Sequence, residues 1–167
     1  HGSSHRRLRG SGPASLLAER SDEMNGLDAD ETRRTLDRGQ HVFTDVFGAS
    51  ARGFLAPAWQ RGHVRMRAWS TSRLDHVLGF FSLESRFGRT VPLATWTWDC
   101  GRWGWLGYLG HGIGRMLTSL GARVPVLAIH PRDVTRGFWP ATLGLTRALL
   151  DQGYEPTTPA ALLEAGC

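Results

Sequence analysis

The sequence predicts an α/β fold in which strands alternate with helices, and three segments carry that prediction. "VPVLAIHP" (residues 124–131) is a continuous apolar run of strand length, as expected of a fully buried parallel strand. The Gly-rich helical segment "GWLGYLGHGIGRMLTSLG" precedes it, and a second helical segment, "FWPATLGLTRALLDQG", follows it. Helix, strand and helix in succession are typical of a parallel α/β architecture.

The first half of the chain is expected to contain strands and one well-marked helix. Residues 10–27 are rich in Gly, Ser and Pro and predict a loop, with one helical turn at "ASLLAER". Asp28 with Glu31 three residues later predicts a capping box, and Gly48 predicts the end of that helix. Its apolar face would contain Leu36, Phe43, Val46 and Phe47. Further elements expected are a strand at "ARGFLAP", a helix over 60–78, and strands at "FFSLES" and "VPLATWTWD".

The second half is expected to end in helices. In the helix before the apolar strand, Trp105, Leu109, Ile113 and Leu117 recur at helical spacing and would form its buried stripe. After the second helix, "YEP" predicts a short strand and "TPAALLEAG" predicts a last helix.

Composition sets limits on the class of protein. The 167 residues, 41% hydrophobic and 21% charged, are consistent with one domain over residues 1–167. All 20 basic residues are arginine, and they are scattered rather than gathered into the basic stripe that nucleic-acid binding requires. No apolar stretch approaches the roughly 20 residues that span a bilayer. Cys100 and Cys167 form no metal-binding pair, and the compartment, cytoplasmic or exported, stays open.

The segment "HGSSH" places His1 and His5 four positions apart. Neutral imidazole is the commonest protein ligand for metals, and this spacing lets two rings converge on one zinc or other divalent ion. Gly and Ser between them favour a loop. The same segment is also compatible with a flexible leader or the remnant of an expression tag, and spacing alone does not choose among these.

Two predicted strand ends carry further candidates for chemistry. His130 ends the apolar strand and is followed by a proline, which places an imidazole where general acid–base catalysis is common. In "ARGFLAPAW", the break at Pro57 exposes the N–H of Ala58 and the indole of Trp59, and a backbone N–H can stabilise an oxyanion. The alternatives without a catalytic role are a hydrogen-bonded histidine at the rim of the sheet for His130 and a simple end of the strand for Pro57.

Seven tryptophans are several times the usual share for a chain of this length. Indoles pack on the apolar faces of sugar rings while their N–H groups bind hydroxyls, so tryptophans near strand ends are candidate sugar-binding residues. Burial in the core is the competing explanation, expected for about half of them. Those near predicted strand ends or loops are Trp59, Trp96, Trp98, Trp103 and Trp105.

In order along the chain, "HGSSH", "RGFLAPAW", "WTWD" and "VLAIHPRD" resemble the motifs of the NodB-homology polysaccharide deacetylases, in the divergent branch with HGxxH, FxxPAW and LxxHP. The tail "GYEPTTPAALLEAG" is similar to the closing strand and helix of the family. The resemblance covers nearly the whole chain. It implies an incomplete (β/α) barrel and metal-dependent removal of acetyl groups from N-acetylated sugars.

The resemblance also implies a role for each matched residue. His1 and His5 would bind zinc, and the N–H of Ala58 would stabilise the oxyanion with Pro57 and Trp59 forming one wall of the groove. His130 would protonate the leaving amine, while Leu127 and Trp98 would enclose the acetyl methyl group. Because Pro131 follows the histidine directly, a partner for His130 is expected from Asp99 or Asp133.

Two departures from the family pattern qualify these expectations. The paired aspartates of the first motif, one the base and one the third zinc ligand, are expected upstream of His1, so that residues 1–167 would be the C-terminal portion of the domain, without its N-terminal strands and inactive by itself. Leu55 stands where most members carry the arginine that orients the base. The alternative is an inactive carbohydrate-binding or regulatory module with the same fold.

Overall fold

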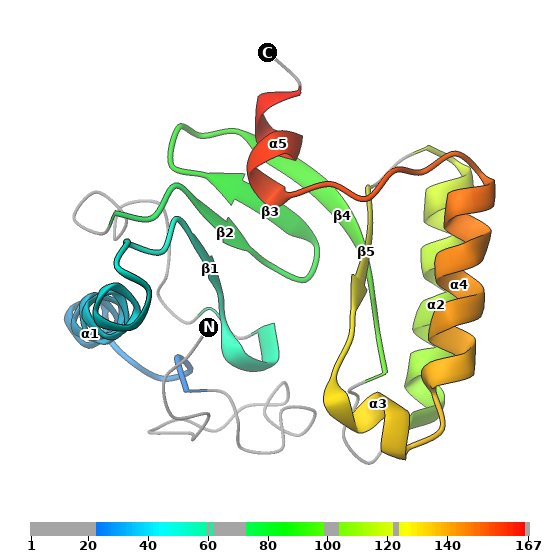
Figure 1. The fold of residues 1–167 in the computed structure, drawn as a ribbon, viewed down its shortest axis with the longest axis horizontal. Helices are drawn as coiled ribbons and strands as arrows, with labels where there is room; N and C mark the ends of the chain where they lie inside the picture. Colours follow the sequence, from blue (N-terminus) through cyan, green and yellow to red (C-terminus); the bar gives the residue numbers. More distant parts are fainter. Residues whose placement is uncertain (1–22, 60, 62–72, 99–103, 122–123, 166–167) are drawn as a thin grey trace. The chain divides into compact units, whose positions relative to one another are not determined.

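The computed structural model describes residues 23–59, 61, 73–98, 104–121 and 124–165, which fall into two compact units, His1–Thr90 and Val91–Cys167 (Figure 1). Both units combine helices with strands, so the chain has a mixed α/β structure. Parallel pairing occurs in each unit, and the first also contains an antiparallel pair. The incomplete barrel stays a prediction.

Helix α1 (Ala29–Phe47) begins and ends where its capping residues predict. The N–H of Glu31 donates to Asp28 Oδ1 at 2.7 Å, and the N–H of Asp28 donates to Glu31 Oε2 at 3.1 Å, which completes the capping box. At the other end Gly48 has φ +71°, and its N–H donates to the carbonyl of Thr44 at 2.8 Å. Both predicted ends of this helix are confirmed.

The apolar face predicted for α1 is correct only in its first half. Leu36 is buried, whereas Phe43, Val46 and Phe47 are exposed. The Gln40 side chain bonds both main-chain groups of Ala51 at 2.8 and 2.9 Å, so the returning chain meets the helix at its middle. Residues 41–49, beyond that point, are all exposed.

Strands β1 (Gly53–Leu55) and β2 (His76–Leu78) pair in parallel, and β2 pairs antiparallel with β3 (Ser82–Ser85). The predicted strands near β1 and β3 are confirmed. The helix predicted over 60–78 is wrong at its end, because residues 76–78 form β2; residues 60 and 62–72 lie outside the described part. Val77 lies opposite Phe54 of β1 on one side and Glu84 of β3 on the other, and Phe54 is remote from it in sequence.

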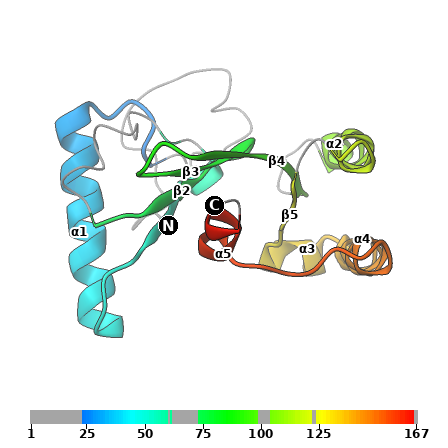
Figure 2. The ribbon, with the colours of Figure 1, turned by 90° about the horizontal axis from the view of Figure 1, so that it is seen from above.

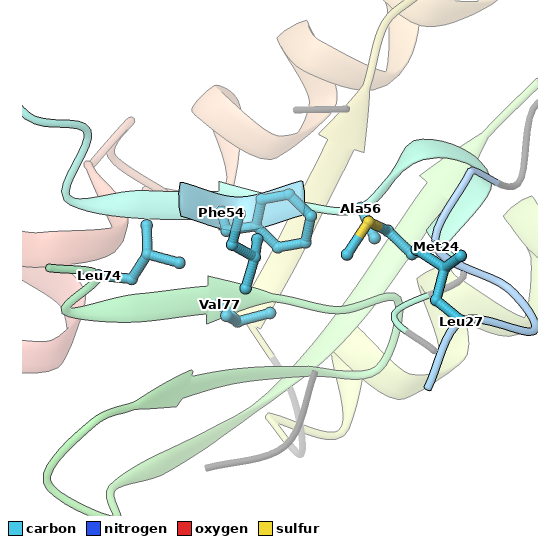
Figure 3. Packing of buried hydrophobic residues seen from close by; sticks show 7 residues of the cluster. Met24, Leu27, Phe54, Ala56, Leu74 and Val77 are labelled. Atoms are coloured by element: carbon cyan, nitrogen blue, oxygen red, sulfur yellow. The ribbon is translucent and has the colours of Figure 1, made fainter. Parts of the chain in front are cut away.

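The core of the first unit lies where β1 and β2 meet the segment before α1. Figure 3 shows Phe54 and Val77 meeting between the two strands and Met24 beside Ala56. All of these side chains are at most 7% exposed. The whole cluster consists of Met24, Leu27, Leu36, Phe54, Ala56, Leu74 and Val77.

In the second unit β4 (Thr90–Thr97) pairs in parallel with β5 (Val124–Ala128), with Leu93 opposite Val124 and Thr97 opposite Ala128. Helices α2 (Gly104–Ser119) and α4 (Trp139–Asp151) run alongside each other (Figures 1 and 2). Both helices and both strands were predicted. The expected full burial of the 124–131 strand is wrong, because every residue of β5 is only half-buried.

The end of the chain differs from its predicted strand and helix in one element. Residues 154–156 form no strand; instead the Tyr154 hydroxyl donates to the carbonyl of Thr118 at 3.4 Å. Helix α5 (Pro159–Glu164) is confirmed, and Thr158 caps it by accepting the N–H of Ala161 at 3.1 Å. A short helix, α3 (Pro131–Thr135), follows β5 directly.

The stripe predicted for α2 is wrong at Leu109 and Ile113; Leu117 is half-buried, and the side chain of Trp105 lies outside the described residues. Leu109 and Ile113 are 54% and 49% exposed. The helix instead turns Gly107 toward Trp98, which directly follows β4, and Gly114, two turns later, toward Trp96 of β4. Two large indoles fill the space between strand and helix, so glycine rather than leucine occupies the facing positions.

Candidate functional site

The segment after β1 has an unusual backbone conformation. Pro57–Trp59 forms a short 3₁₀ turn in which Ala58 has φ +50° and ψ +24°, and Trp59 has φ +61°. The N–H of Trp59 donates to the carbonyl of Ala56 at 3.0 Å. A non-glycine residue in the left-handed region costs about 1–3 kcal/mol, and such residues cluster at functional sites. The predicted strand break at Pro57 is confirmed, and the role of the Ala58 N–H stays a prediction.

Aromatic rings gather beside this turn. Trp59 packs edge-on against Phe80 with ring centroids 5.4 Å apart, and Phe80 packs edge-on against Phe81 at 4.8 Å. Trp59 is half-buried, whereas Phe81 is 66% exposed. The turns after β1 and β2 therefore present a partly exposed aromatic surface, which is a suitable platform for a sugar ring.

A charged cluster lies next to the same turns. Arg61 Nη1 donates to Glu84 Oε1 at 2.7 Å, and the Ser82 hydroxyl donates to the same oxygen at 2.8 Å. The Arg61 guanidinium also lies over Gly79, where a Cβ would be 3.3 Å from its Cζ. Burial acts to raise the pKa of Glu84, but the hydrogen bonds from Arg61 and Ser82 outweigh it and the pKa is lowered.

The pairing of Arg61 with Glu84 was not predicted from the sequence. The motif analysis did not assign a role to either residue. The signal was the alternation in "SLES", which puts Leu83 in the core and Ser82 and Glu84 on the other face of β3. The arginine partner could not be identified, because it is 23 residues away in the chain.

A second charged cluster lies at the opposite ends of β1 and β2. Asp75 accepts a hydrogen bond from Arg52 Nε at 2.6 Å and lies 3.7 Å from Arg86 Nη1. The hydrogen bond from Arg52 is the main reason that the pKa of Asp75 is lowered, although burial opposes it. Burial lowers the pKa of the adjacent His76, whose ring covers Gly53. These ion pairs join the beginnings of the strands to the turn after β3.

In the second unit, the parallel strands β4 and β5 bring Trp98 and His130 to the same edge. Thr97 lies opposite Ala128, so Trp98 follows β4 at the level where the chain of β5 continues toward His130. This is the carboxyl edge of the parallel pair, where α/β proteins place their sites. Leu127 lies opposite Trp96 in the register.

Asp133 is tied to His130 through the main chain. Its Oδ2 accepts the N–H of His130 at 2.8 Å, and the N–H of Asp133 donates to the carbonyl of His130 at 2.9 Å. Asp133 is 1% exposed, and its Oδ1 has no hydrogen-bond partner within the described part of the chain. Asp133 thus fixes the backbone that carries His130; a partnership with the imidazole stays a prediction.

Trp98 is held on the helix side of β4. It is 6% exposed, its ring stacks on Phe138 at 4.9 Å, and its Nε1 donates to Thr142 Oγ1 at 2.9 Å. Trp96 is 5% exposed. These two tryptophans follow the expectation of core burial, and contact of Trp98 with an acetyl group stays a prediction.

The predicted metal ligands lie beyond what the structure describes. His1 and His5 are outside the described residues, and so is Asp99, one of the two predicted partners of His130. Among the described residues, no group of three or more His, Cys, Asp or Glu side chains could hold a metal ion. The same residues include no helix with the length and apolarity that crossing a membrane requires.

The predicted site residues with described positions therefore form two sets. Pro57, Ala58 and Trp59 lie together after β1 in the first unit, and Trp98, Leu127 and His130 lie together at the ends of β4 and β5 in the second. Comparison with known proteins adds no relative: no protein-family model, no curated protein and no solved structure matches this chain.

Proposed function

We propose that this protein is a metal-dependent hydrolase of the NodB-homology polysaccharide deacetylase type, which removes acetyl groups from N-acetylated sugars. The four ordered motifs from "HGSSH" to "VLAIHPRD" are the basis of the proposal. The observation that supports it best is the left-handed backbone of Ala58 and Trp59 at the end of β1. The turn that matches the FxxPAW motif holds a conformation that costs free energy, as functional turns often do.

The proposed chemistry uses the chain's own residues as follows. The N–H of Ala58 donates a hydrogen bond to the oxygen that becomes negative when water attacks the amide carbonyl. His130 donates a proton to the amine nitrogen as the carbon–nitrogen bond breaks. Trp59 contacts the sugar ring, with Pro57 beside it, while Leu127 and Trp98 contact the acetyl methyl group.

Zinc is the proposed cofactor, and the donor chemistry of His1 and His5 suits it because imidazole is a preferred zinc ligand. A bound zinc would polarise the carbonyl and acidify a water molecule. The described residues contribute no complete ligand set. In the family order, the paired aspartates that supply the base and the third ligand precede the histidine pair. Asp99 or Asp133 would support His130.

The test is metal content together with acetate release from N-acetylated oligosaccharides, measured on the protein at its natural length. His1→Ala and His5→Ala should lose both zinc and turnover, while His130→Ala should lose turnover and keep zinc. His41→Ala, on the exposed face of α1, is the matched control and should change neither. Absence of bound metal, or full turnover in His130→Ala, would contradict the proposal.

A second candidate function is carbohydrate binding without turnover. The aromatic surface of Trp59, Phe80 and Phe81 favours it, since stacking on a sugar ring requires no catalytic group. Saturable binding of N-acetylated oligosaccharides that Phe81→Ser weakens, with zinc bound and no acetate released, would support this function over hydrolysis.

A further inference from the structure

A guanidinium and a carboxylate are paired beside the aromatic surface of the first unit, and neither belongs to the deacetylase motifs. Arg61 comes two residues after Trp59 in the chain. Its guanidinium lies against Gly79, which directly precedes Phe80 of the same surface. Arg61 Nη1 donates to Glu84 Oε1 at 2.7 Å. The ion pair and the aromatic rings are therefore neighbours within one compact unit.

The packing around this pair holds both side chains in place. The Ser82 hydroxyl donates to the same Glu84 oxygen at 2.8 Å, so that Oε1 accepts two hydrogen bonds. The side chains of Arg61 and Glu84 are only 30% and 22% exposed. Ordering a long side chain upon binding costs conformational entropy, and two side chains that are already ordered lose little more. The pair is therefore organised before any ligand arrives.

Each partner keeps a polar atom that a ligand can reach. Glu84 Oε2 and Arg61 Nη2 form no hydrogen bond with any described residue. Neither atom is among the buried, unpaired side-chain atoms of the described residues, so both are accessible to solvent. A carboxylate oxygen only accepts hydrogen bonds, and a guanidinium N–H only donates them. The surface thus presents one acceptor and one donor on two groups that are bonded to each other.

Two neighbouring hydroxyl groups on a sugar ring fit this arrangement. One hydroxyl donates to the carboxylate while the next accepts from the guanidinium, and both hydrogen bonds are strengthened by the charge of the protein group. The charges of the pair cancel, which suits an uncharged sugar better than an anion or a cation. The apolar face of the ring would pack on the aromatic side chains. We propose that Arg61 and Glu84 bind two neighbouring hydroxyls of a sugar residue that packs on the aromatic surface.

The choice of an N-acetylated sugar as the ligand rests on the proposed function. Methyl N-acetyl-β-glucosaminide is the probe, because it has two neighbouring hydroxyls and its two deoxy analogues each lack one of them. The readout is the indole N–H signal of Trp59 in the ¹⁵N-labelled protein, assigned by its loss in Trp59→Phe. The parent sugar should shift this signal saturably, and each deoxy analogue should bind about tenfold more weakly, because it loses a hydrogen bond to a charged group.

Glu84→Gln tests the carboxylate directly. It should weaken binding of the parent sugar about fivefold, because a neutral amide replaces a charged acceptor. In this variant the loss of affinity caused by one of the two missing hydroxyls should shrink, since the two changes affect the same hydrogen bond. An ion pair with a purely structural role would not produce this dependence on a ligand hydroxyl.

The ion pair at the opposite ends of β1 and β2 supplies the matched control. Asp75→Asn removes a carboxylate that is likewise bonded to an arginine of the same unit, and it should leave sugar binding unchanged. The deoxy analogues test the parent protein and decide the matter even if Glu84→Gln does not fold. The proposal is overturned if the sugar produces no saturable shift, if both analogues bind as well as the parent sugar, or if Asp75→Asn weakens binding as much as Glu84→Gln. Acetate in the same samples reports hydrolysis separately: hydroxyl-dependent binding without acetate supports this proposal and counts against hydrolysis alone.

Discussion

A Cβ atom on Gly114 would overlap the indole nitrogen of Trp96, so strand β4 and helix α2 approach each other more closely there than any other residue would allow. Two helical turns earlier in α2, a Cβ on Gly107 would lie 2.8 Å from Trp98 Cε3. Trp96 of β4 and Trp98, which directly follows the strand, are two residues apart and both indoles pack against α2. The two indoles and the two glycines together determine the separation of strand and helix.

Gly114→Ala should therefore lower the free energy of unfolding by about 1–3 kcal/mol, since the indole must move to make room. Gly110→Ala and Gly112→Ala are matched controls in the same helix, where an added Cβ meets nothing within 4 Å. They should raise the free energy of unfolding by up to about 1 kcal/mol, because alanine favours helix. Urea unfolding followed by circular dichroism measures all three. Equal effects at the three positions would contradict the packing described.

The glycines also show what the sequence could predict. Capping residues act within a turn of the chain, so Asp28 and Gly48 predicted both ends of α1 correctly. The spacing in α2 predicted a helix but the wrong buried face, because the choice of face depends on two tryptophans from another element. Strand β2 was missed in part for the same reason, since its parallel partners in β1 are remote in sequence, although its antiparallel partners in β3 are close.

The candidate site was predictable to a similar extent. The motif residues mark the ends of β1, β4 and β5, and strand ends follow from local signals such as Pro57 and Pro131. The left-handed conformation at Ala58 has no such signal, because alanine does not favour positive φ. Asp133 accepts the main-chain N–H of His130, a contact that was not predicted, and the predicted partnership of Asp99 or Asp133 with the imidazole stays a prediction.

Asp133→Ala should destabilise the second unit by about 1–3 kcal/mol, because the partly buried N–H of His130 loses its 2.8 Å acceptor. Asp133→Asn keeps an acceptor oxygen at the same position and should cost less. The measurement is the urea midpoint of each variant, with amide hydrogen exchange at His130 as the local readout. Faster exchange in Asp133→Ala than in Asp133→Asn is expected; equal rates would mean that this hydrogen bond does not hold the strand end.

Thr142→Val should destabilise the protein through Trp98. The indole Nε1 donates to Thr142 Oγ1 at 2.9 Å within a buried cluster, and valine leaves that donor unpaired at a cost of about 1–3 kcal/mol. A double-mutant cycle with Trp98→Phe isolates the contribution of this hydrogen bond to stability, because phenylalanine has no donor to leave unpaired. The cost of Thr142→Val should shrink when Trp98 is already phenylalanine. An unchanged cost would place the effect on the bond from Thr142 to the Phe138 carbonyl.

The pair of Arg61 and Glu84 should make stability depend on acidity. The pKa of Glu84 is lowered from its ordinary 4.5, because the hydrogen bonds from Arg61 and Ser82 outweigh burial. Its contribution to stability is therefore present above pH 4.5 and lost as the pH falls through the lowered folded-state value. Urea midpoints across this range should fall less steeply with acid in Glu84→Gln than in the parent protein. Arg61→Gln should lower the urea midpoint at neutral pH. If the midpoint of Glu84→Gln fell with acid as steeply as that of the parent protein, the role assigned to Glu84 would be contradicted.

Ala58→Gly tests whether the turn after β1 stores strain. Alanine at φ +50° is disfavoured, and glycine adopts this region without a Cβ clash. Relief of strain should exceed the added freedom that glycine gives the unfolded chain, so the free energy of unfolding should rise by up to about 1 kcal/mol. Ala56→Gly, two residues earlier and 1% exposed, is the matched control and should lower it, because that alanine is not at positive φ and its methyl group is buried. A loss of stability in both variants would mean that the conformation of Ala58 carries no strain.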